Sequence, residues 1–349
     1  MGGYIKSKLH MGGVHLAQLV KLQDYVSRYE KDLKRYTTQF VRLKKVQWIR
    51  MKSDWETGNI HGELEVEEAE EKPKKSFLPR FFRRKSKKTQ DDENIEGSTE
   101  YFFTENEKEL NGELVPDMHE EENAYTFQPS FYFAPQTMDD LKRMYIDQLF
   151  QFQMKWASST LREESHLSPR YTRDTLLRAF TQRLPDSYLL LYRPVFQIKR
   201  APVEAGIILL TPTQCLCIGI LEEEVQAAFI PDGSRFWTKK IGKIDKKILS
   251  PLIGLNRTES IVKQIFRENG IEMPIKKIVL SRNGYINDTN TSFGIEYIDK
   301  KTYPDWFSYL KKNSSPMKAM QLKAAQSLLQ NVLTTSYNKM DPGEDAASH

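Results

Sequence analysis

Two cysteines stand close enough together to suggest metal chemistry. Cys215 and Cys217 are the two cysteines of this 349-residue chain, and they lie two positions apart in an apolar run. On a strand that spacing puts both side chains on one face, which is a poor geometry for a disulfide. A Cys-x-Cys pair can bind a soft metal, but no second group of cysteines or histidines accompanies it. We therefore expect buried, reduced thiols, as in a reducing cytoplasm.

Basic residues interleaved with aromatic ones form a second pattern with chemical meaning. Residues 72–88 hold nine Lys or Arg and no acid, together with Phe77, Leu78, Phe81 and Phe82. Such an island suits an anionic lipid surface or a nucleic acid. Acidic runs on both sides of the island would pair with its basic residues, so the alternative interpretation is a spacer whose positive and negative charges neutralise each other. No apolar stretch approaches the ~18–20 residues of a membrane span, and no signal peptide is evident.

Charge divides the chain into regions. Residues 1–61 carry 12 basic and 5 acidic residues, residues 62–124 carry 10 and 19, and residues 125–349 carry 30 and 23. The net charges are therefore +7, −9 and +7, which sum to +5 for the chain. The sequence predicts a helical leader at 1–61, a disordered charged linker at 62–124, a folded domain at 125–340 with its core at about 170–300, and a disordered tail at 341–349.

Apolar spacing predicts the elements that must position any site. In the leader it predicts two helices, separated near Thr37-Thr38. The further expected helices are Met138–Arg162, Pro169–Leu184, Asn256–Glu268, Asp305–Lys311 and Met317–Tyr337. The expected strands are Tyr188–Lys199, Val203–Leu210, Gln214–Leu221, Gln226–Ile230, Lys276–Ser281 and Phe293–Ile298. This order predicts an α/β or α+β fold with a mixed sheet.

The same order, with several short motifs, resembles the nuclease-related domain (NERD) family. The motifs are Leu-Pro-Asp-Ser-Tyr-Leu-Leu-Leu at 184–191, Ala-Pro-Val-Glu-Ala-Gly-Ile-Ile-Leu-Leu-Thr-Pro at 201–212, Cys-Ile at 217–218, Arg-Phe-Trp at 235–237 and Ser-Pro-Leu at 250–252. The run from Leu19 to Trp48 is similar to the leader of bacterial, Bacillus-type members. The resemblance implies a restriction-endonuclease-like mixed sheet flanked by helices, with an N-terminal helical leader.

The resemblance also implies where a nuclease centre would lie. In that fold, an acid on one strand and an acid and a lysine two residues apart on the next hold and assist a divalent metal ion. Carboxylates suit Mg²⁺, and the metal activates water and stabilises charge on the phosphate. With the chain aligned on Thr211-Pro212, these positions hold Gly206, Gly219 and Leu221. None of the three can bind a metal or transfer a proton, which predicts a degenerate, catalytically silent centre.

Two nearby carboxylates offer a displaced metal site as the alternative. Glu204 stands two residues before Gly206, ~6.6 Å away along an extended strand, and Glu223 has the same parity as Gly219 and Leu221. An active nuclease built this way needs the two carboxylates within ~5 Å of each other, with Mg²⁺ or Mn²⁺ between them. The competing interpretation makes Glu204 a solvated residue and Glu222-Glu223-Glu224 a solvated turn.

Three functions stay open at this point. The first is a pseudoenzyme that binds DNA, another nucleic acid or a protein partner, the second an active metal-dependent nuclease, and the third an interaction scaffold. The expected nucleic-acid contacts are Lys199, Arg200, Arg235, Lys239 and Lys240. No metal or other cofactor is expected unless the displaced carboxylates are used. Serine-hydrolase, Walker and dinucleotide-binding motifs are absent from the sequence.

Overall fold

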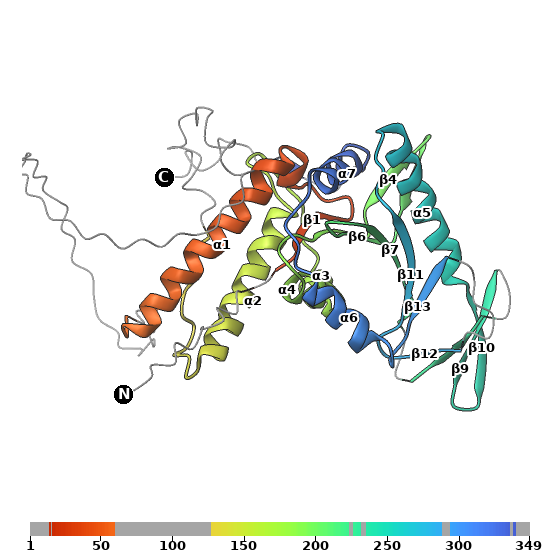
Figure 1. Cartoon of the computed structure of the whole chain (residues 1–349), viewed down its shortest axis with the longest axis horizontal. Coiled ribbons are helices and arrows are strands. Elements are labelled where there is room, and N and C mark those ends of the chain that lie inside the picture. Colours follow the sequence, from red (N-terminus) through yellow and green to blue (C-terminus); the bar gives the residue numbers. More distant parts are fainter. Residues whose placement is uncertain are drawn as a thin grey trace, which may run out of the picture. The chain divides into compact units, whose positions relative to one another are not determined.

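A six-stranded mixed sheet forms the centre of the protein, which is described by a computed structural model (Figure 1). Its strands, in spatial order, are β1 (Gln18–Leu22), β3 (Leu189–Tyr192), β6 (Ile207–Leu210), β7 (Cys215–Ile220), β11 (Ile275–Leu280) and β13 (Ile295–Ile298). β3, β6 and β7 are antiparallel neighbours, whereas β1 is parallel to β3, β11 to β7 and β13 to β11. The predicted mixed sheet is confirmed.

The structure describes residues 14, 16–59, 127–222, 226–231, 235–287, 294–335 and 338–339. These residues belong to one compact unit. The predicted linker at 62–124, its basic-aromatic island at 72–88 and the predicted tail at 341–349 lie outside the described residues, as does Glu223.

Helices cover both faces of the central sheet. On one face lie α5 (Pro251–Glu268) and α7 (Ala319–Leu329), and on the other α4 (Thr175–Arg183) and α6 (Tyr303–Lys312), as Figure 1 shows. α1 (Leu33–Glu56) and α2 (Met138–Trp156) complete the packing, with a short α3 at Pro169–Thr172. Because both faces are covered, the central strands are continuous apolar runs.

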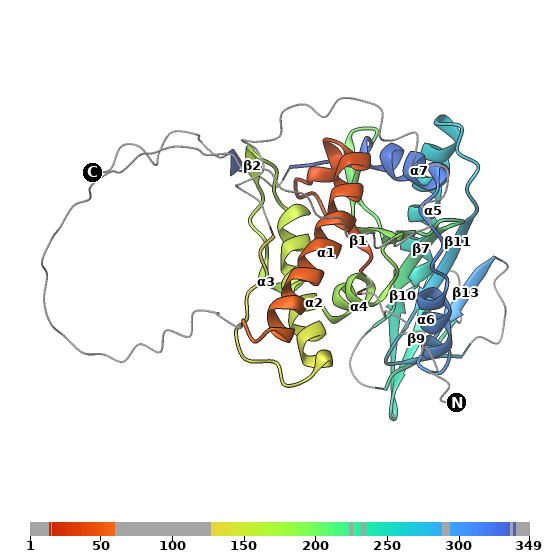
Figure 2. The ribbon, with the colours of Figure 1, turned by 60° about the vertical axis from the view of Figure 1, so that its left-hand side comes forward.

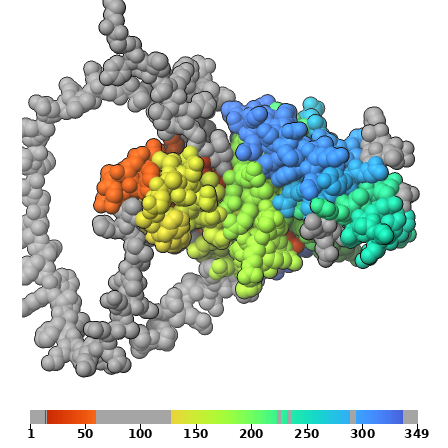
Figure 3. Space-filling model, turned by 90° about the horizontal axis from the view of Figure 1, so that it is seen from below, coloured from red at the N-terminus to blue at the C-terminus, as the bar shows by residue number. Residues whose placement is uncertain are grey.

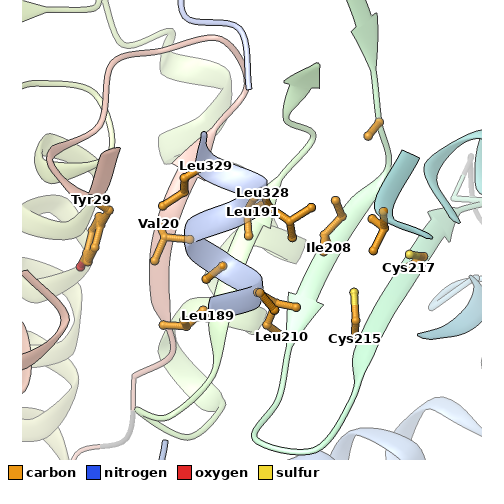
Figure 4. Close-up of a cluster of buried hydrophobic side chains, with 14 of the residues drawn as sticks. Val20, Tyr29, Leu189, Leu191, Ile208, Leu210, Cys215, Cys217, Leu328 and Leu329 are labelled. Atoms are coloured by element: carbon orange, nitrogen blue, oxygen red, sulfur yellow. The ribbon is translucent and has the colours of Figure 1, made fainter. Parts of the chain in front are cut away.

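The two cysteines lie inside this packing, as predicted. Figure 4 shows Cys215 and Cys217 on the side of β7 that faces the same apolar cluster as Leu328 and Leu329 of α7. Both thiols are buried and free. A hydrogen bond with Cys217 and burial raise the pKa of the Cys215 thiol. These are core side chains rather than a metal pair.

The prediction of the first of the two helices in the leader is wrong. Gln18–Leu22 forms strand β1, with all five residues buried, and a 3₁₀ turn at Arg28–Glu30 leads to the single helix α1. Thr37 and Thr38 do not break α1, because both hydroxyls donate to the carbonyl oxygen of Lys34, at 3.0 and 2.9 Å. An apolar segment of this length is compatible with the periodicity of a helix or of a strand, and its pairing with β3 makes it a strand.

Two predicted strands are each broken into two. Tyr188–Lys199 becomes β3 and β4 (Val195–Ile198), and Val203–Leu210 becomes β5 (Ala201–Glu204) and β6. β4 and β5 pair only with each other, as a two-stranded sheet. A short β2 (Glu163–Glu164) likewise pairs with β14 (Asn338–Lys339).

A further sheet carries a hairpin that the sequence analysis did not predict. Its order is β10 (Ile244–Leu249), β9 (Phe236–Ile241), β8 (Ala228–Ile230) and β12 (Tyr285–Ile286). The β9–β10 turn contains Gly242 at φ +59°, a conformation that glycine adopts without strain. The hairpin projects away from the central sheet in both views (Figures 1 and 2).

Candidate nuclease centre and nucleic-acid interface

The positions at which a nuclease would hold its metal ligands do lie together. Ile207 of β6 is opposite Ile218 of β7, so the next opposite pair in this antiparallel register is Gly206 and Gly219. Leu221 follows directly after the end of β7. The structure therefore brings all three predicted positions to one edge of the sheet, but with no side chain that could bind a metal.

Helix α5 packs directly over the two glycines. The backbone N–H of Gly206 donates to Oγ1 of Thr258 at 2.8 Å. A Cβ added at Gly219 would lie 3.5 Å from Cβ of Leu255, and both Leu255 and Thr258 are buried. A Cβ added at Gly206 would lie 2.7 Å from the carbonyl oxygen of Ile218, closer than real Cβ atoms approach. This backbone therefore cannot accept an aspartate at position 206 without moving.

The position of the expected lysine is part of the hydrophobic core. Leu221 is buried in the cluster that also contains Leu255 and Cys217. Its backbone N–H donates to the carbonyl oxygen of Leu280 at 2.8 Å, which ties the end of β7 to β11. A charged side chain here would have to be desolvated without a partner, at a cost of several kcal/mol.

The displaced carboxylate Glu204 belongs to a different sheet from Gly206. It ends β5, is opposite Val195 of β4, and has an exposed side chain. Because β5 ends at Glu204 and β6 begins at Ile207, the continuous strand that would put Glu204 and Gly206 on one face is absent. In the ranges that the structure describes, no group of three or more His, Cys, Asp or Glu is placed to hold a metal ion.

Glu222, expected in a solvated turn, is ion-paired. Its Oε2 accepts from Nη2 of Arg282 at 2.6 Å, and its Oε1 accepts from Nε of the same guanidinium. Arg282 also donates to Oγ1 of Thr175, at 3.1 Å. Because β7 and β11 are parallel, the residues that follow them meet at one edge of the sheet, although they are 60 positions apart. Nothing in the local sequence around Glu222 or around Arg282 indicates that these two residues form an ion pair.

The five predicted nucleic-acid contacts are divided between two hairpins. Lys199 and Arg200 form the exposed turn of the β4–β5 hairpin, and Arg235 and Lys240 are exposed on the β9–β10 side. Lys239 is 7% exposed and therefore does not contribute to the surface. Figure 1 places β4 and the β9–β10 hairpin at opposite ends of the sheet region. The structure thus separates these residues into two surfaces.

One face of the β9–β10 hairpin is turned to solvent. Trp237 and Lys239 are buried, so they define the inner face of β9. The residues that alternate with them on β9, and the residues opposite these on β10, point to the other side and form the face turned to solvent. We call it the outer hairpin face, and it consists of Phe236, Thr238, Lys240, Asp245, Lys247 and Leu249.

The outer hairpin face combines exposed apolar groups with positive charge. Phe236 and Leu249 are opposite each other and are 47% and 59% exposed. Cζ of Arg235 lies 5.7 Å from the centroid of the Phe236 ring. Lys240 is 3.5 Å from a carboxylate oxygen of Asp245, and Lys247 donates to Thr238 at 2.9 Å. Residues 235–249 as a whole carry six basic residues and one acid, a net charge of +5.

Comparison with known proteins gives one short match. An RNA 2',3'-cyclic phosphodiesterase of Geobacillus stearothermophilus is 50% identical over 44 residues, which is 13% of this chain and 14% of that protein. The chain thus spans only a small part of the relative it matches. No protein-family model and no solved structure matches the chain. Within the described residues, no helix combines the length and the apolar character that crossing a membrane requires.

Proposed function

We propose that this chain is a nuclease-related protein that binds nucleic acid without cutting it, through the outer hairpin face. The observation that carries the proposal is a hairpin with a net charge of +5 over residues 235–249, whose outer face presents Lys240 and Lys247 beside the exposed Phe236–Leu249 pair. Lysine and arginine neutralise backbone phosphates, and an exposed aromatic ring can stack on a base. The mixed character of this face favours nucleic acid over a purely apolar protein partner.

The central sheet supports the nuclease-related part of the proposal. Helix α4, the antiparallel strands β3, β6 and β7, helix α5 and the parallel strand β11 follow one another in the order that the family resemblance implies. The packing of α5 over Gly206 and Gly219, with Leu221 in the core, supports the absence of cleavage. The two free buried thiols are compatible with a reducing compartment such as the cytoplasm.

The binding test is fluorescence anisotropy with the full chain and labelled single-stranded DNA, single-stranded RNA and duplex DNA. RNA is included because the relative that matches over 44 residues is named for an RNA substrate. We expect the affinity to fall steeply with salt, and the double variant Lys240→Gln/Lys247→Gln to bind about tenfold more weakly with a shallower salt slope. An affinity that is independent of salt would contradict the proposal.

The β4–β5 hairpin provides a matched control. Lys199→Gln/Arg200→Gln removes the same charge from exposed residues of another sheet. We expect it to retain most of the affinity. Equal losses in both double variants would show that net charge, rather than the outer hairpin face, determines binding.

Cleavage is tested separately by incubating the same substrates with Mg²⁺ or Mn²⁺. We expect intact substrate. Metal-dependent cleavage that disappears in Glu204→Ala would establish the active nuclease with displaced ligands instead.

A further inference from the structure

A pocket lies between the end of helix α4 and helix α6, outside the surfaces described above. It has a volume of about 320 Å³ and is lined by Arg183, Tyr303, Pro304, Phe307, Ser308 and Lys311. Small-molecule pockets in proteins begin at about 300 Å³. In Figure 3 the lime-green segment that contains α4 and the blue segment that contains α6 border each other on one face. Neither the glycine positions nor the outer hairpin face contributes a residue to this pocket.

Arg183 is held in place by the pocket floor. Its Cζ lies 5.1 Å from the centroid of the Phe307 ring. Phe307 is 3% exposed and stacks on Phe180, with ring centroids 6.3 Å apart. Among the described residues, no carboxylate forms an ion pair with Arg183. A stacked guanidinium of this kind loses little conformational entropy when it binds an anion, and its N–H groups stay available.

Helix α6 supplies the other polar groups. Lys311 stands four positions after Phe307 and so projects from the same side of the helix. Its side chain is exposed and forms no ion pair within the described part of the chain. Ser308 and Tyr303 each add a hydroxyl, and burial raises the pKa of Tyr303. Asp305, the one acid of α6, does not line the pocket.

We propose that this pocket binds an organic phosphomonoester, with its phosphate at Arg183 and Lys311 and its organic part against Tyr303 and Pro304. Two cations match the two charges of a phosphomonoester, and the planar guanidinium can donate to two of its oxygens at once. The third oxygen has an ammonium or a hydroxyl as donor. A carboxylate offers two oxygens and one charge, so it would leave part of this donor set without an acceptor.

The test is calorimetric titration of the full chain with adenosine monophosphate, inorganic phosphate and adenosine. We expect saturable binding of adenosine monophosphate, weaker binding of inorganic phosphate, and none of adenosine. Arg183→Gln and Lys311→Gln should each weaken binding of adenosine monophosphate about tenfold, the usual effect of losing a charged hydrogen bond. Lys312→Gln is the matched control, because Lys312 is the neighbouring exposed lysine and does not line the pocket.

Several outcomes would overturn this proposal. They are the absence of saturation with adenosine monophosphate up to about 10 mM, an equal loss in Lys312→Gln, and equal affinity for inorganic phosphate and the nucleotide. Because Arg183 packs on Phe307, the thermal stability of Arg183→Gln is measured together with its binding. Lys311 is exposed, so Lys311→Gln tests the site without disturbing the fold. Lys240→Gln/Lys247→Gln should leave nucleotide binding unchanged, which separates this site from the outer hairpin face.

Discussion

Gly206 and Thr258 join the central sheet to helix α5 through a hydrogen bond of 2.8 Å from the glycine N–H to the threonine hydroxyl oxygen. The same hydroxyl donates to the carbonyl oxygen of Gly254, one turn earlier in the helix, at 3.0 Å. The contact fixes α5 across the β6–β7 pair, where a nuclease of the resembled family would hold its metal ion. Glycine at position 206 therefore has a structural role in this protein.

We predict that restoring the expected acid destabilises the fold instead of restoring a metal site. In Gly206→Asp the new Cβ meets the carbonyl oxygen of Ile218 at 2.7 Å, so β6 or β7 must shift. The free energy of unfolding should fall by about 1–3 kcal/mol, the usual cost of overpacking. Urea denaturation measures the loss, and a melting temperature that does not rise with Mg²⁺ shows that no metal site has formed.

Gly254→Ala is the matched control for this variant. A Cβ at Gly254 meets nothing within 4 Å, and the residue is exposed within α5. Alanine should therefore stabilise the helix by about 0.5–1 kcal/mol. If Gly206→Asp is as stable as the unchanged protein, the packing of α5 over the glycines is not as tight as described.

Thr258→Val tests the hydrogen bond itself. Valine keeps the shape of threonine but leaves the Gly206 N–H without its acceptor. We expect a loss of about 1–3 kcal/mol in the free energy of unfolding, because an unsatisfied polar group is left at the sheet–helix contact. Amide hydrogen exchange at Gly206 should become faster relative to its neighbours in β6. Unchanged exchange would mean that helix packing, and not the hydrogen bond, protects this amide.

The ion pair between Lys44 and Asp186 should contribute to how stability depends on pH. Lys44 is buried on α1, where its Nζ contacts Asp186 and donates to the carbonyl oxygen of Val14 at 2.6 Å. Burial lowers the pKa of Lys44, and Asp186 opposes that change. Between the lowered pKa of the folded state and the ordinary value of 10.5, the unfolded lysine binds more protons than the folded one, so stability rises with pH in that window.

In Asp186→Asn the opposing charge is gone, so the pKa of Lys44 falls further and the window extends to lower pH. We expect a loss of about 3 kcal/mol at neutral pH, part of which returns as the pH approaches 10. Urea denaturation at several pH values measures this slope. Adding Lys44→Met to the variant removes the uncompensated charge and should remove the part of the slope that Asp186→Asn added, leaving the contribution of Lys21, whose pKa burial also lowers. A double variant that keeps the added slope would refute the assignment.

We predict that ionisation of the buried Tyr188 hydroxyl lowers the free energy of unfolding at alkaline pH. Its hydroxyl donates to the carbonyl oxygens of Leu310 and Asn313, both at 3.1 Å. Burial raises the pKa of Tyr188 from 10.0 to about 12. The folded state therefore retains the proton longer, and this contribution is complete below pH 10.0 and is lost as the pH rises to about 12.

Tyr188→Phe should lower the free energy of unfolding by about 1 kcal/mol at neutral pH and make its decline above pH ~10 shallower. Tyrosinate absorbance and urea denaturation follow the two effects together. Tyr132→Phe is the control, because the side chain of Tyr132 is 67% exposed and its hydroxyl is not part of the buried contact at Tyr188. An alkaline decline in Tyr188→Phe as steep as in the unchanged protein would assign the effect to other tyrosines.

The motif at 184–191 illustrates how a sequence signal and its physical role differ. In the sequence, Asp186 is one residue of a run that resembles a nuclease-related domain. In the structure it accepts from the backbone N–H of Leu16 at 2.7 Å and binds Lys44, so it fastens the leader to the sheet. Those partners lie more than 140 positions away in the chain, and no local pattern could identify them.

The sequence by itself determined the mixed α/β character, the order of most central elements, the buried cysteines, and the absence of metal-binding side chains at positions 206, 219 and 221. Those conclusions depend on residue identity and on local apolar period. Only the tertiary structure decided that Gln18–Leu22 is a strand, that Glu222 binds Arg282, and that Lys239 is buried while Lys240 is exposed. These outcomes depend on which strands become neighbours, and contacts between distant segments select that pairing.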